Sequence, residues 1–233
     1  MNAAPALAFG DDVERALFAA GHAIVPGLLG ADECAALRAS YERDAMFRSR
    51  VVMERHRFGR GEYRYFAYPL PPLVERLRRE TYALLAPLAN EWMKRLGSAE
   101  RFPLDLAQLL ARCGEHEQTR PTPLLLKYGA GDFNCLHQDL YGEIAFPLQV
   151  AVVLSTPQVD YTGGEFVLAE QRPRAQTRIE VLTPQRGDAL IFPNRYRPVA
   201  GTRGTHRAAV RHGVSTVRSG ERYTLGLIFH DAQ

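Results

Sequence analysis

Long apolar runs, cysteine and lysine are scarce in this chain of 233 residues. No apolar run approaches the roughly 18 residues that a membrane span needs, so we expect no membrane anchor. Met1 to Gly10 contain no basic stretch followed by a long apolar one, which predicts no secretory signal and a cytoplasmic location. The length and the hydrophobic content of 46% predict one globular domain over residues 1–233, with a sizeable core.

Cysteine occurs at three widely spaced positions, Cys34, Cys113 and Cys135. An odd number without a CxxC pair excludes a disulfide framework and a cysteine-rich zinc site. Residues two apart share one face of a strand, so Cys135, His137 and Asp139 are able to point the same way. We interpret Cys135 as a small buried residue near a site rather than as a ligand.

Lysine occurs only at Lys94 and Lys127, so arginine supplies the other 27 of the 29 basic residues. Arginine suits phosphate and carboxylate recognition, but a net charge of +3 is weak evidence for a polyanionic partner. Basic and aromatic residues interleave most densely between Arg48 and Tyr68. Such a segment either holds phosphates and stacks bases, or covers a sheet edge or forms a lid; we favour the structural interpretation.

The first part of the chain, residues 11–97, is predicted to be mostly helical. Apolar periodicity indicates a helix from Asp11 or Asp12 to Gly21, a strand at 22–26, a helix after Gly30 and a helix from about Pro72 to Leu96. An aspartate is expected to cap each of the first two helices, Asp32 in the second. Pro87 should kink the third helix or split it in two.

From Pro123 onward the period changes toward two, and turn residues separate short β-rich runs. The runs are Leu124–Tyr128, Leu148–Leu154, Glu165–Leu168, Arg178–Leu182, Ala189–Phe192, Ala208–Val210, Val214–Val217 and Tyr223–Phe229. This pattern predicts an antiparallel jelly roll of the cupin type, a double-stranded β-helix, over residues 123–231. The expected fold class is therefore mainly β with a helical N-terminal part (α+β).

Three residues of this β-rich part have the chemistry of metal ligands: His137, Asp139 and His212. Two imidazoles and one carboxylate hold non-haem Fe(II) while leaving positions free for a co-substrate and O2. His137 and Asp139 are two residues apart, so an extended chain presents both to one metal. His212 must arrive from a distant strand, which a closed double-sheet fold allows. The weaker alternative is that these are ordinary core or surface residues.

Arg222 lies ten residues after His212 and begins an Arg-Tyr-Thr triplet. Its guanidinium is a fixed, bidentate partner for a carboxylate. Together with the triad it predicts an oxygenase that consumes 2-oxoglutarate. The spacing also favours His212 over His206, which has no Arg-x-Thr ten residues downstream. We interpret His230, which follows Arg222, as a structural or supporting residue.

Several stretches resemble the Fe(II)/2-oxoglutarate-dependent dioxygenases, and most of the chain resembles one bacterial family among them. The stretches are GRGEYRYFAYPLP from Gly59, KYGAGDFNCLHQDLYGEIAFPLQ from Lys127, TGGEFVLAEQRPR from Thr162, RGDALIF from Arg186, RPVAGTRG from Arg197 and RHGVSTVRSGERYTLGLIFHDA from Arg211. That family carries a label for oxidative demethylation of damaged DNA. The order of its motifs is similar to that of prolyl hydroxylases.

The resemblance implies a role for each matching residue. His137, Asp139 and His212 would hold Fe(II), with O2 as a further co-substrate. Arg222 would pair with the distal carboxylate of 2-oxoglutarate, and Thr224 would donate its hydroxyl from the same strand face.

Further positions near these motifs are candidates for the same pocket. Tyr128 is similar to a tyrosine that prolyl-hydroxylase-like members place near the co-substrate; an ordinary strand tyrosine is the alternative. Asn134, Gln138 and Gln149 are weaker candidates for polar pocket positions. Residues 194–211 form a longer connection than is usual in the superfamily, and we interpret them as a substrate loop.

Three functions remain open from the sequence. The first is oxidative dealkylation of damaged nucleic acid, with release of succinate and CO2. The second is hydroxylation of a protein or peptide. The third is a non-catalytic sensor that binds a metal or 2-oxoglutarate. The sequence does not indicate an oligomeric state.

Overall fold

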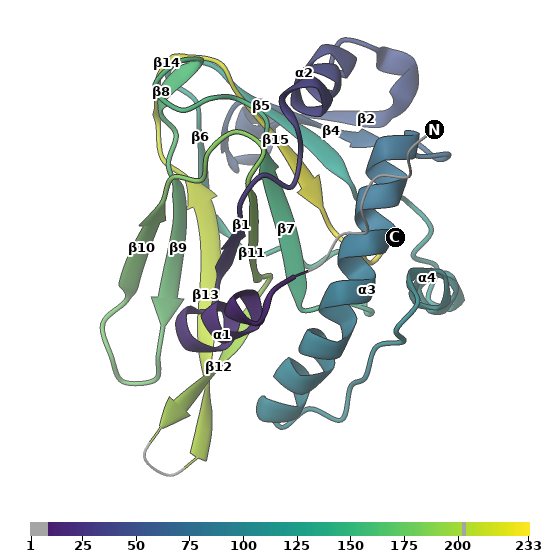
Figure 1. The fold of residues 1–233 in the computed structure, drawn as a ribbon, viewed down its shortest axis with the longest axis vertical. Coiled ribbons are helices and arrows are strands. Elements are labelled where there is room, and N and C mark those ends of the chain that lie inside the picture. Colours follow the sequence, from purple (N-terminus) through teal and green to yellow (C-terminus); the bar gives the residue numbers. More distant parts are fainter. Residues whose placement is uncertain (1–8, 202–203) are drawn as a thin grey trace.

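The computed structural model describes residues 9–201 and 204–233 and arranges them as two facing β-sheets with helices against one of them (Figure 1). Residues 1–8, which enter the prediction of no secretory signal, lie outside the described residues. Among the helices of the described ranges, none combines the length and apolarity that crossing a membrane requires.

The larger sheet has seven strands in the order β1-β11-β7-β15-β5-β4-β2, and every neighbouring pair is antiparallel. The strands in this order are Ala23–Val25, Ala189–Pro193, Leu148–Val153, Arg222–Leu227, Leu124–Tyr128, Glu62–Phe66 and Phe47–Val52. The central strand β15 is hydrogen-bonded to β7 on one side and to β5 on the other. Its side chains are therefore held in place from both edges.

The smaller sheet runs β10-β9-β13-β6-β3, and β12 pairs with the far end of β13. These strands are Arg178–Leu182, Phe166–Gln171, Gly204–Val214, Phe133–His137, Gly59–Arg60 and Tyr196–Gly201. A two-stranded ribbon, β8 (Tyr161–Gly163) with β14 (Val217–Gly220), lies at one end of the barrel. The two facing antiparallel sheets confirm the predicted jelly-roll core.

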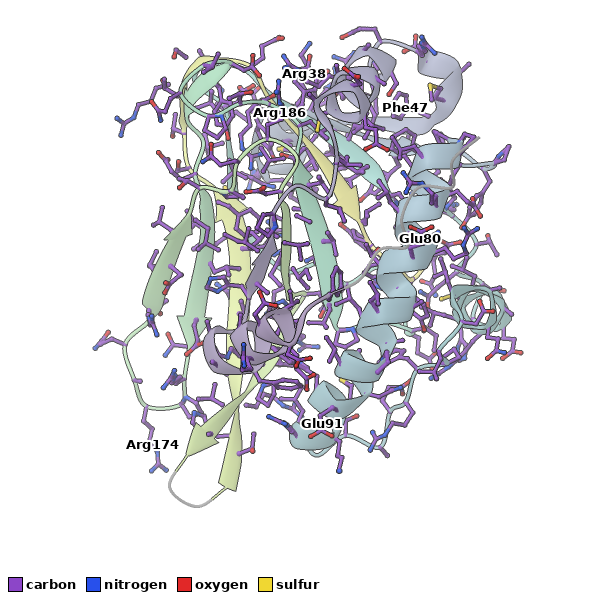
Figure 2. The ribbon with its side chains drawn as sticks, viewed as in Figure 1. Arg38, Phe47, Glu80, Glu91, Arg174 and Arg186 are labelled. Carbon is purple, nitrogen blue, oxygen red and sulfur yellow. The ribbon has the colours of Figure 1, made fainter. Side chains whose placement is uncertain are left out.

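Four α-helices and two short 3-10 helices make up the helical part of the described chain. They are α1 (Asp11–Ala20), α2 (Ala31–Ser40), α3 (Pro72–Arg95), α4 (Leu106–Glu115), η1 (Asp44–Met46) and η2 (Met53–His56). The long helix α3 runs along the larger sheet (Figure 1) and shares with it one apolar core. Charged side chains such as Arg174 and Arg186 project into solvent from the turns (Figure 2).

Alternate residues of the larger sheet face different neighbours, as a period of two requires. On β15, Tyr223, Leu225 and Leu227 belong to the core shared with the helices. Arg222 and Thr224 point to the opposite side, into the space between the two sheets. We call these two sides of the larger sheet its helix face and its cavity face. Burial of each large apolar side chain contributes roughly 1.5–3 kcal/mol to the free energy of unfolding. Packing on the helix face therefore stabilises the sheet that carries the cavity.

Pro87 was predicted to kink the third helix or to split it; it lies inside α3, which runs unbroken from Pro72 to Arg95, so the split is wrong. Proline lacks the donor for an intrahelical hydrogen bond. The helix nevertheless continues because Leu85 and Trp92, on either side of Pro87, are both fully buried in the core. Their packing outweighs the local cost of the proline, which is about 3 kcal/mol.

The predicted aspartate caps are also wrong, because Gly10 and Gly30 occupy the N-cap positions and the acidic residues lie in the first turns. Glu33 takes over the capping role in α2, where its carboxylate accepts a hydrogen bond of 3.0 Å from the backbone N–H of Gly30. Acidic side chains in a first turn are favourable for the helix dipole as well. The helix boundaries themselves agree with the prediction.

Residues 47–66, for which we favoured a structural role such as covering a sheet edge, are largely strand, since β2 and β4 extend the larger sheet at its edge. Two other segments differ from their predicted conformation. The predicted substrate loop at 194–211 instead contains β12, which pairs antiparallel with β13; residues 202 and 203 lie outside the described residues. The predicted strand Val214–Val217 is interrupted, because β13 ends at Val214 and β14 begins at Val217.

Candidate active site

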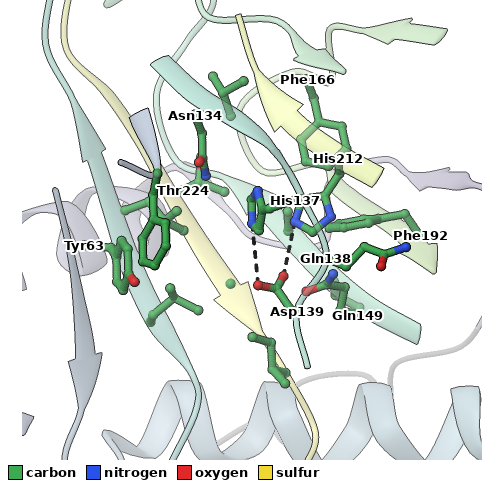
Figure 3. Close-up of a pocket in the computed structure, with 18 of the residues that line it drawn as sticks. Tyr63, Asn134, His137, Gln138, Asp139, Gln149, Phe166, Phe192, His212 and Thr224 are labelled. Atoms are coloured by element: carbon green, nitrogen blue, oxygen red, sulfur yellow. Dashed lines mark ion pairs between the residues drawn. The ribbon is translucent and has the colours of Figure 1, made fainter. Parts of the chain in front are cut away.

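A cavity of about 210 Å³ lies between the two sheets (Figure 3). Apolar and aromatic side chains line most of it, and the polar groups are few. The polar lining residues, tyrosines aside, are Asn134, His137, Gln138, Asp139, Gln149, His212, Arg222 and Thr224. All six predicted site residues, Tyr128 among them, line the same cavity. A largely apolar cavity with a few convergent polar groups is the usual form of a small-molecule site.

The predicted metal ligands lie together at one wall of this cavity (Figure 3). The Nε2 atom of His212 is 3.1 Å from Oδ2 of Asp139, and Nε2 of His137 is 3.5 Å from Oδ1. One donor atom from each of the three residues lies within 4.8 Å of the other two. This spacing and this donor set suit one divalent transition-metal ion.

His137 is oriented by a backbone hydrogen bond. Its Nδ1 donates to the carbonyl oxygen of Cys135 over 2.8 Å, which turns Nε2 toward the carboxylate of Asp139. Such a bond to the second ring nitrogen is the common way to orient a metal-binding histidine.

The side chain of Cys135 is exposed, so its predicted burial is wrong. The register between β6 and β13 shifts, because His137 pairs with His212 whereas Asn134 pairs with Val214. Between these pairs, Cys135 and Leu136 of β6 thus oppose the single residue Gly213 of β13, which is a β-bulge. The bulge breaks the expected alternation, so Asn134 and His137 line the cavity while Cys135 contributes its backbone carbonyl.

His212 is held by aromatic packing instead. Its ring stacks on Phe166 at a centroid distance of 5.9 Å and lies 4.8 Å from the ring of Phe192. Burial and the neighbouring charge of His137 lower the pKa of His212, which keeps its imidazole neutral and able to bind a metal. His206 lies farther along β13, opposite Val199, and takes no part in the triad.

Asp139 is buried but remains ionised. Burial alone would raise the pKa of its carboxyl, but the neighbouring His212 and His137 outweigh burial and hold this pKa well below its usual range. The hydroxyl of Tyr141 donates a hydrogen bond of 2.6 Å to Oδ1 of Asp139. Tyr141 was not among the predicted site residues, although its position two residues after Asp139 is visible in the sequence.

Arg222 is buried, with 2% of its surface exposed, yet no carboxylate of the described chain forms an ion pair with it. Its Nη1 donates to Oγ1 of Thr224 over 2.7 Å, and its Nε has no partner among the described residues. The rings of Tyr128 and Tyr161 lie 5.6 and 6.0 Å from the guanidinium carbon. A buried cation without a counter-charge is costly, so this wall of the cavity suits an anionic ligand.

Tyr128 and three amide side chains complete the polar lining. Tyr128 is fully buried, which raises its pKa to about 12, and its hydroxyl accepts a hydrogen bond of 3.3 Å from Asn134. Gln149 is buried and its Nε2 has no partner among the described residues. Gln138 instead donates to the carbonyls of Val210 and Arg195, so it joins its loop to the smaller sheet.

His230 supports the structure next to the site, as predicted. Its Nδ1 accepts a hydrogen bond of 3.1 Å from the backbone N–H of Phe146. Burial and the charge of Arg78 lower the pKa of His230 to about 4, so the ring stays neutral. It is not part of the metal-ligand group.

The residues present fit both an Fe(II) ion and 2-oxoglutarate. Two imidazole nitrogens and one carboxylate are the donor set of non-haem iron oxygenases, and they leave coordination positions free. The guanidinium of Arg222, which has no counter-charge in the described chain, lies in the same cavity and suits the distal carboxylate of a dicarboxylic acid. The apolar remainder of the cavity excludes water from the space between them.

The sequence matches the family model Oxygenase-NA over residues 61–232; its description reads "Oxygenase, catalysing oxidative methylation of damaged DNA". A protein of Mycobacterium tuberculosis (strain ATCC 25618 / H37Rv), named "Uncharacterized protein Rv2227", is 53% identical over 167 residues, which make up 72% of this chain and 72% of that protein. The residues that the family model matches include the whole triad and Arg222.

Two solved structures share the fold. A Pseudomonas putida prolyl-4-hydroxylase aligns with a TM-score of 0.57 and 16% identity, covering 95% of this chain and 98% of its own. An oxidoreductase of the 2OG-Fe(II) oxygenase family from Burkholderia pseudomallei aligns with a TM-score of 0.53 and 20% identity, covering 95% and 90%. At these identities the likeness concerns the fold, and it confirms the double-stranded β-helix.

Proposed function

The chain belongs to the Oxygenase-NA family, and on that premise we propose that it is an Fe(II)- and 2-oxoglutarate-dependent dioxygenase. The reaction would hydroxylate a C–H bond of a substrate and release succinate and CO2. One observation carries this proposal: His137, Asp139 and His212 lie in the same cavity as a buried guanidinium without a counter-charge.

Iron with bound 2-oxoglutarate and O2 supplies an oxidant that is strong enough to attack an unactivated C–H bond. The protein contributes binding, orientation and exclusion of water. His137, Asp139 and His212 would hold the metal, and Arg222 with Thr224 would orient the dicarboxylate. Tyr128, between Arg222 and the metal-binding strand, would close the co-substrate's end of the cavity.

We propose damaged nucleic acid as the substrate, following the description of the family. Hydroxylation of an N-methyl carbon gives an N-hydroxymethyl group, and this group breaks down to formaldehyde and the free N–H. The methyl group is thereby removed, so the net reaction on such a base is a demethylation. One O2 supplies one oxygen atom to the methyl carbon and the other to succinate.

Hydroxylation of a protein or peptide is the second candidate. It is favoured by the order of Tyr128, the His-x-Asp pair, His212 and Arg222, which is similar to that of prolyl hydroxylases. A sensor that binds a metal without turnover is disfavoured, because the donor set is complete and the cation for a co-substrate is in place.

The first test is succinate formation from 2-oxoglutarate by anaerobically purified, Fe(II)-loaded protein after exposure to O2. It would be run alone, with N-methylated DNA and with a proline-rich peptide, and Asp139→Ala would provide the blank. We expect succinate above the blank, stimulated by methylated DNA together with formaldehyde. Stimulation by the peptide alone would select the second candidate. Bound iron and 2-oxoglutarate without any succinate would overturn the proposed activity.

A further inference from the structure

A short exposed turn, Glu54–Phe58, lies at the mouth of the cavity; we refer to it as the rim turn. The rings of His56 and Phe58 are stacked, with centroids 5.3 Å apart and an angle of 22° between the ring planes. Phe58 is 49% exposed, and it also lines the cavity that holds the triad. Phe58 thus presents an aromatic ring both to solvent and to the cavity, where a ligand entering the cavity is able to contact it.

The rim turn is held rigidly next to the metal-binding strand. The carbonyl of Phe58 accepts a hydrogen bond of 2.8 Å from the N–H of Cys135, whose own carbonyl orients His137. Met53, at the start of the turn, is fully buried. Gly59 follows the turn at a φ of 136°, and a Cβ there would lie 2.3 Å from the carbonyl oxygen of Phe133. The turn therefore cannot move away from the cavity without breaking the edge of the smaller sheet.

The arginines of the rim turn differ from the others in the same basic and aromatic segment. Arg48 donates to the carbonyl of Pro121 over 2.9 Å, Arg50 to Glu62 over 2.8 Å and Arg64 to Asp44 over 2.5 Å. In contrast, Arg55 and Arg57 are exposed and form no ion pair or side-chain hydrogen bond within residues 9–201 and 204–233.

Two exposed guanidiniums beside a stacked aromatic pair suit both the phosphates and the bases of a nucleotide chain. Phosphates pair with the arginines, and bases stack on the rings. We propose that the rim turn binds single-stranded nucleic acid and stacks a base that flanks the one entering the cavity. This inference rests on the proposed function, because it names the substrate class of the same site.

A peptide fits this surface less well. Peptides that bind an oxygenase-like sheet by strand addition need a long free edge for main-chain hydrogen bonds. The edge next to the triad is β3, which has only two residues, Gly59 and Arg60, and is followed directly by β4 of the other sheet. Arg60 is moreover engaged with Glu54 over 2.9 Å.

A duplex also fits less well than a single strand. The triad lies inside the cavity, with Asp139 and His212 buried, so a methylated base reaches it only after leaving its stack. Unpaired bases pay the smallest cost for that movement. Two exposed leucines that flank the His137–Asp139 pair in sequence, Leu136 and Leu140, add apolar surface.

The test is binding of a fluorescein-labelled 15-nucleotide single-stranded DNA to the full chain, loaded with Fe(II) and 2-oxoglutarate without O2, over a series of salt concentrations. Phe58→Ala should weaken binding about tenfold, because stacking on one ring is lost, and Phe58→Tyr should restore it. Arg55→Gln combined with Arg57→Gln should reduce the slope of log Kd against log salt by about 1.4, from two lost phosphate contacts.

The matched control is Arg15→Gln combined with Arg174→Gln. These arginines are also exposed and without ion pairs in the described chain, and Arg174 has the same φ of 59° as Arg57. The control should leave the affinity and the salt slope unchanged. A control that weakens binding as much as the rim variants would overturn the proposal, since it would show binding by overall charge.

Two outcomes separate this inference from the proposed function. Succinate formation by a protein that does not bind the oligonucleotide, or binds it independently of Phe58, would overturn the role of the rim turn alone. Phe58-dependent binding without succinate formation would overturn the proposed activity alone. Phe58-dependent binding of a 15-residue proline-rich peptide, with no binding of DNA, would assign the rim turn to peptides.

Discussion

Leu225 and Arg222 lie on the same central strand and are almost equally buried, with exposures of 0% and 2%, but they face opposite sides of the sheet. Leu225 lies in the apolar core that the sheet shares with α3. Arg222 lies in a cavity where its Nε has no partner. Equal burial therefore differs in its consequence on the two faces. The face toward the helices packs within the chain, whereas the face toward the cavity leaves a buried polar atom of Arg222 without a partner.

The comparison predicts that substitutions on the two faces of the larger sheet affect different quantities. A substitution on the helix face should change the free energy of unfolding and leave ligand affinity alone. A substitution on the cavity face should do the reverse. Four variants test this separation.

Arg222→Met should have the largest effect. Hydrogen bonds to charged groups contribute about 1.5–3 kcal/mol, so we expect the KM for 2-oxoglutarate to rise roughly 10- to 150-fold. The ligand-free variant should be at least as stable as the wild type, because a buried unpaired charge has been replaced by an apolar side chain. Titration with 2-oxoglutarate and urea unfolding measure the two quantities; an unchanged KM would remove Arg222 from the site.

Leu225→Ala provides the complementary test on the helix face. Removing a fully buried leucine side chain typically lowers the free energy of unfolding by about 2–5 kcal/mol. The KM for 2-oxoglutarate should stay at the wild-type value below the unfolding transition, since Leu225 does not touch the cavity. A rise in KM similar to that of Arg222→Met would contradict the separation of the two faces.

Tyr141→Phe should have a moderate effect on metal affinity. The tyrosine hydroxyl donates to one oxygen of Asp139, and loss of such a supporting hydrogen bond typically weakens metal binding about 10- to 100-fold. Anaerobic titration with Fe(II) or Co(II) measures the change. Tyr63→Phe is the control, because Tyr63 lines the same cavity without a hydrogen bond to the triad. Equal metal affinities of wild type and Tyr141→Phe would show that Asp139 is positioned by the histidines alone.

His230→Asn tests the pH dependence of stability at a buried residue that follows β15. The pKa of His230 falls from 6.5 to about 4 on folding, so the unfolded chain binds the extra proton between these values. The stability contributed by the neutral ring is present above pH 6.5 and is lost as the pH falls toward 4. Between pH 6.5 and 5 the wild type should lose about 2 kcal/mol more than the variant. Urea unfolding at both pH values measures these losses. Equal losses of unfolding free energy in the wild type and the variant would contradict the prediction.

Local sequence signals predicted the strands well where the period of two was unbroken. Leu124–Tyr128 and Arg178–Leu182 have the predicted boundaries. The signal failed at β6, where the bulge places Asn134 and His137 on one face and turns Cys135 outward. The predicted alternative of a split at Pro87 failed as well, because burial on the larger sheet compensates a local defect that periodicity alone cannot weigh.

The sequence predicted which residues form the candidate site, but not the contacts that hold them in place. Spacing alone indicated His137, Asp139, His212 and Arg222, and the structure brings all of them to one cavity. The hydrogen bond from Tyr141 to Asp139 joins residues two apart, but its geometry depends on the chain leaving β6 after His137. The role of Phe166 and Phe192 in holding His212 depends on strands that are distant in the sequence.

The sequence by itself determined which groups are available for chemistry and on which face of a strand they lie, because side-chain identity and the alternation of a strand are local properties. Only the tertiary structure decided which of these groups are left without a partner. Whether Arg222 or Arg64 meets a carboxylate depends on what the opposite sheet and the neighbouring helices bring to it. An unpartnered charge is a property of the assembled chain, and here it marks the site.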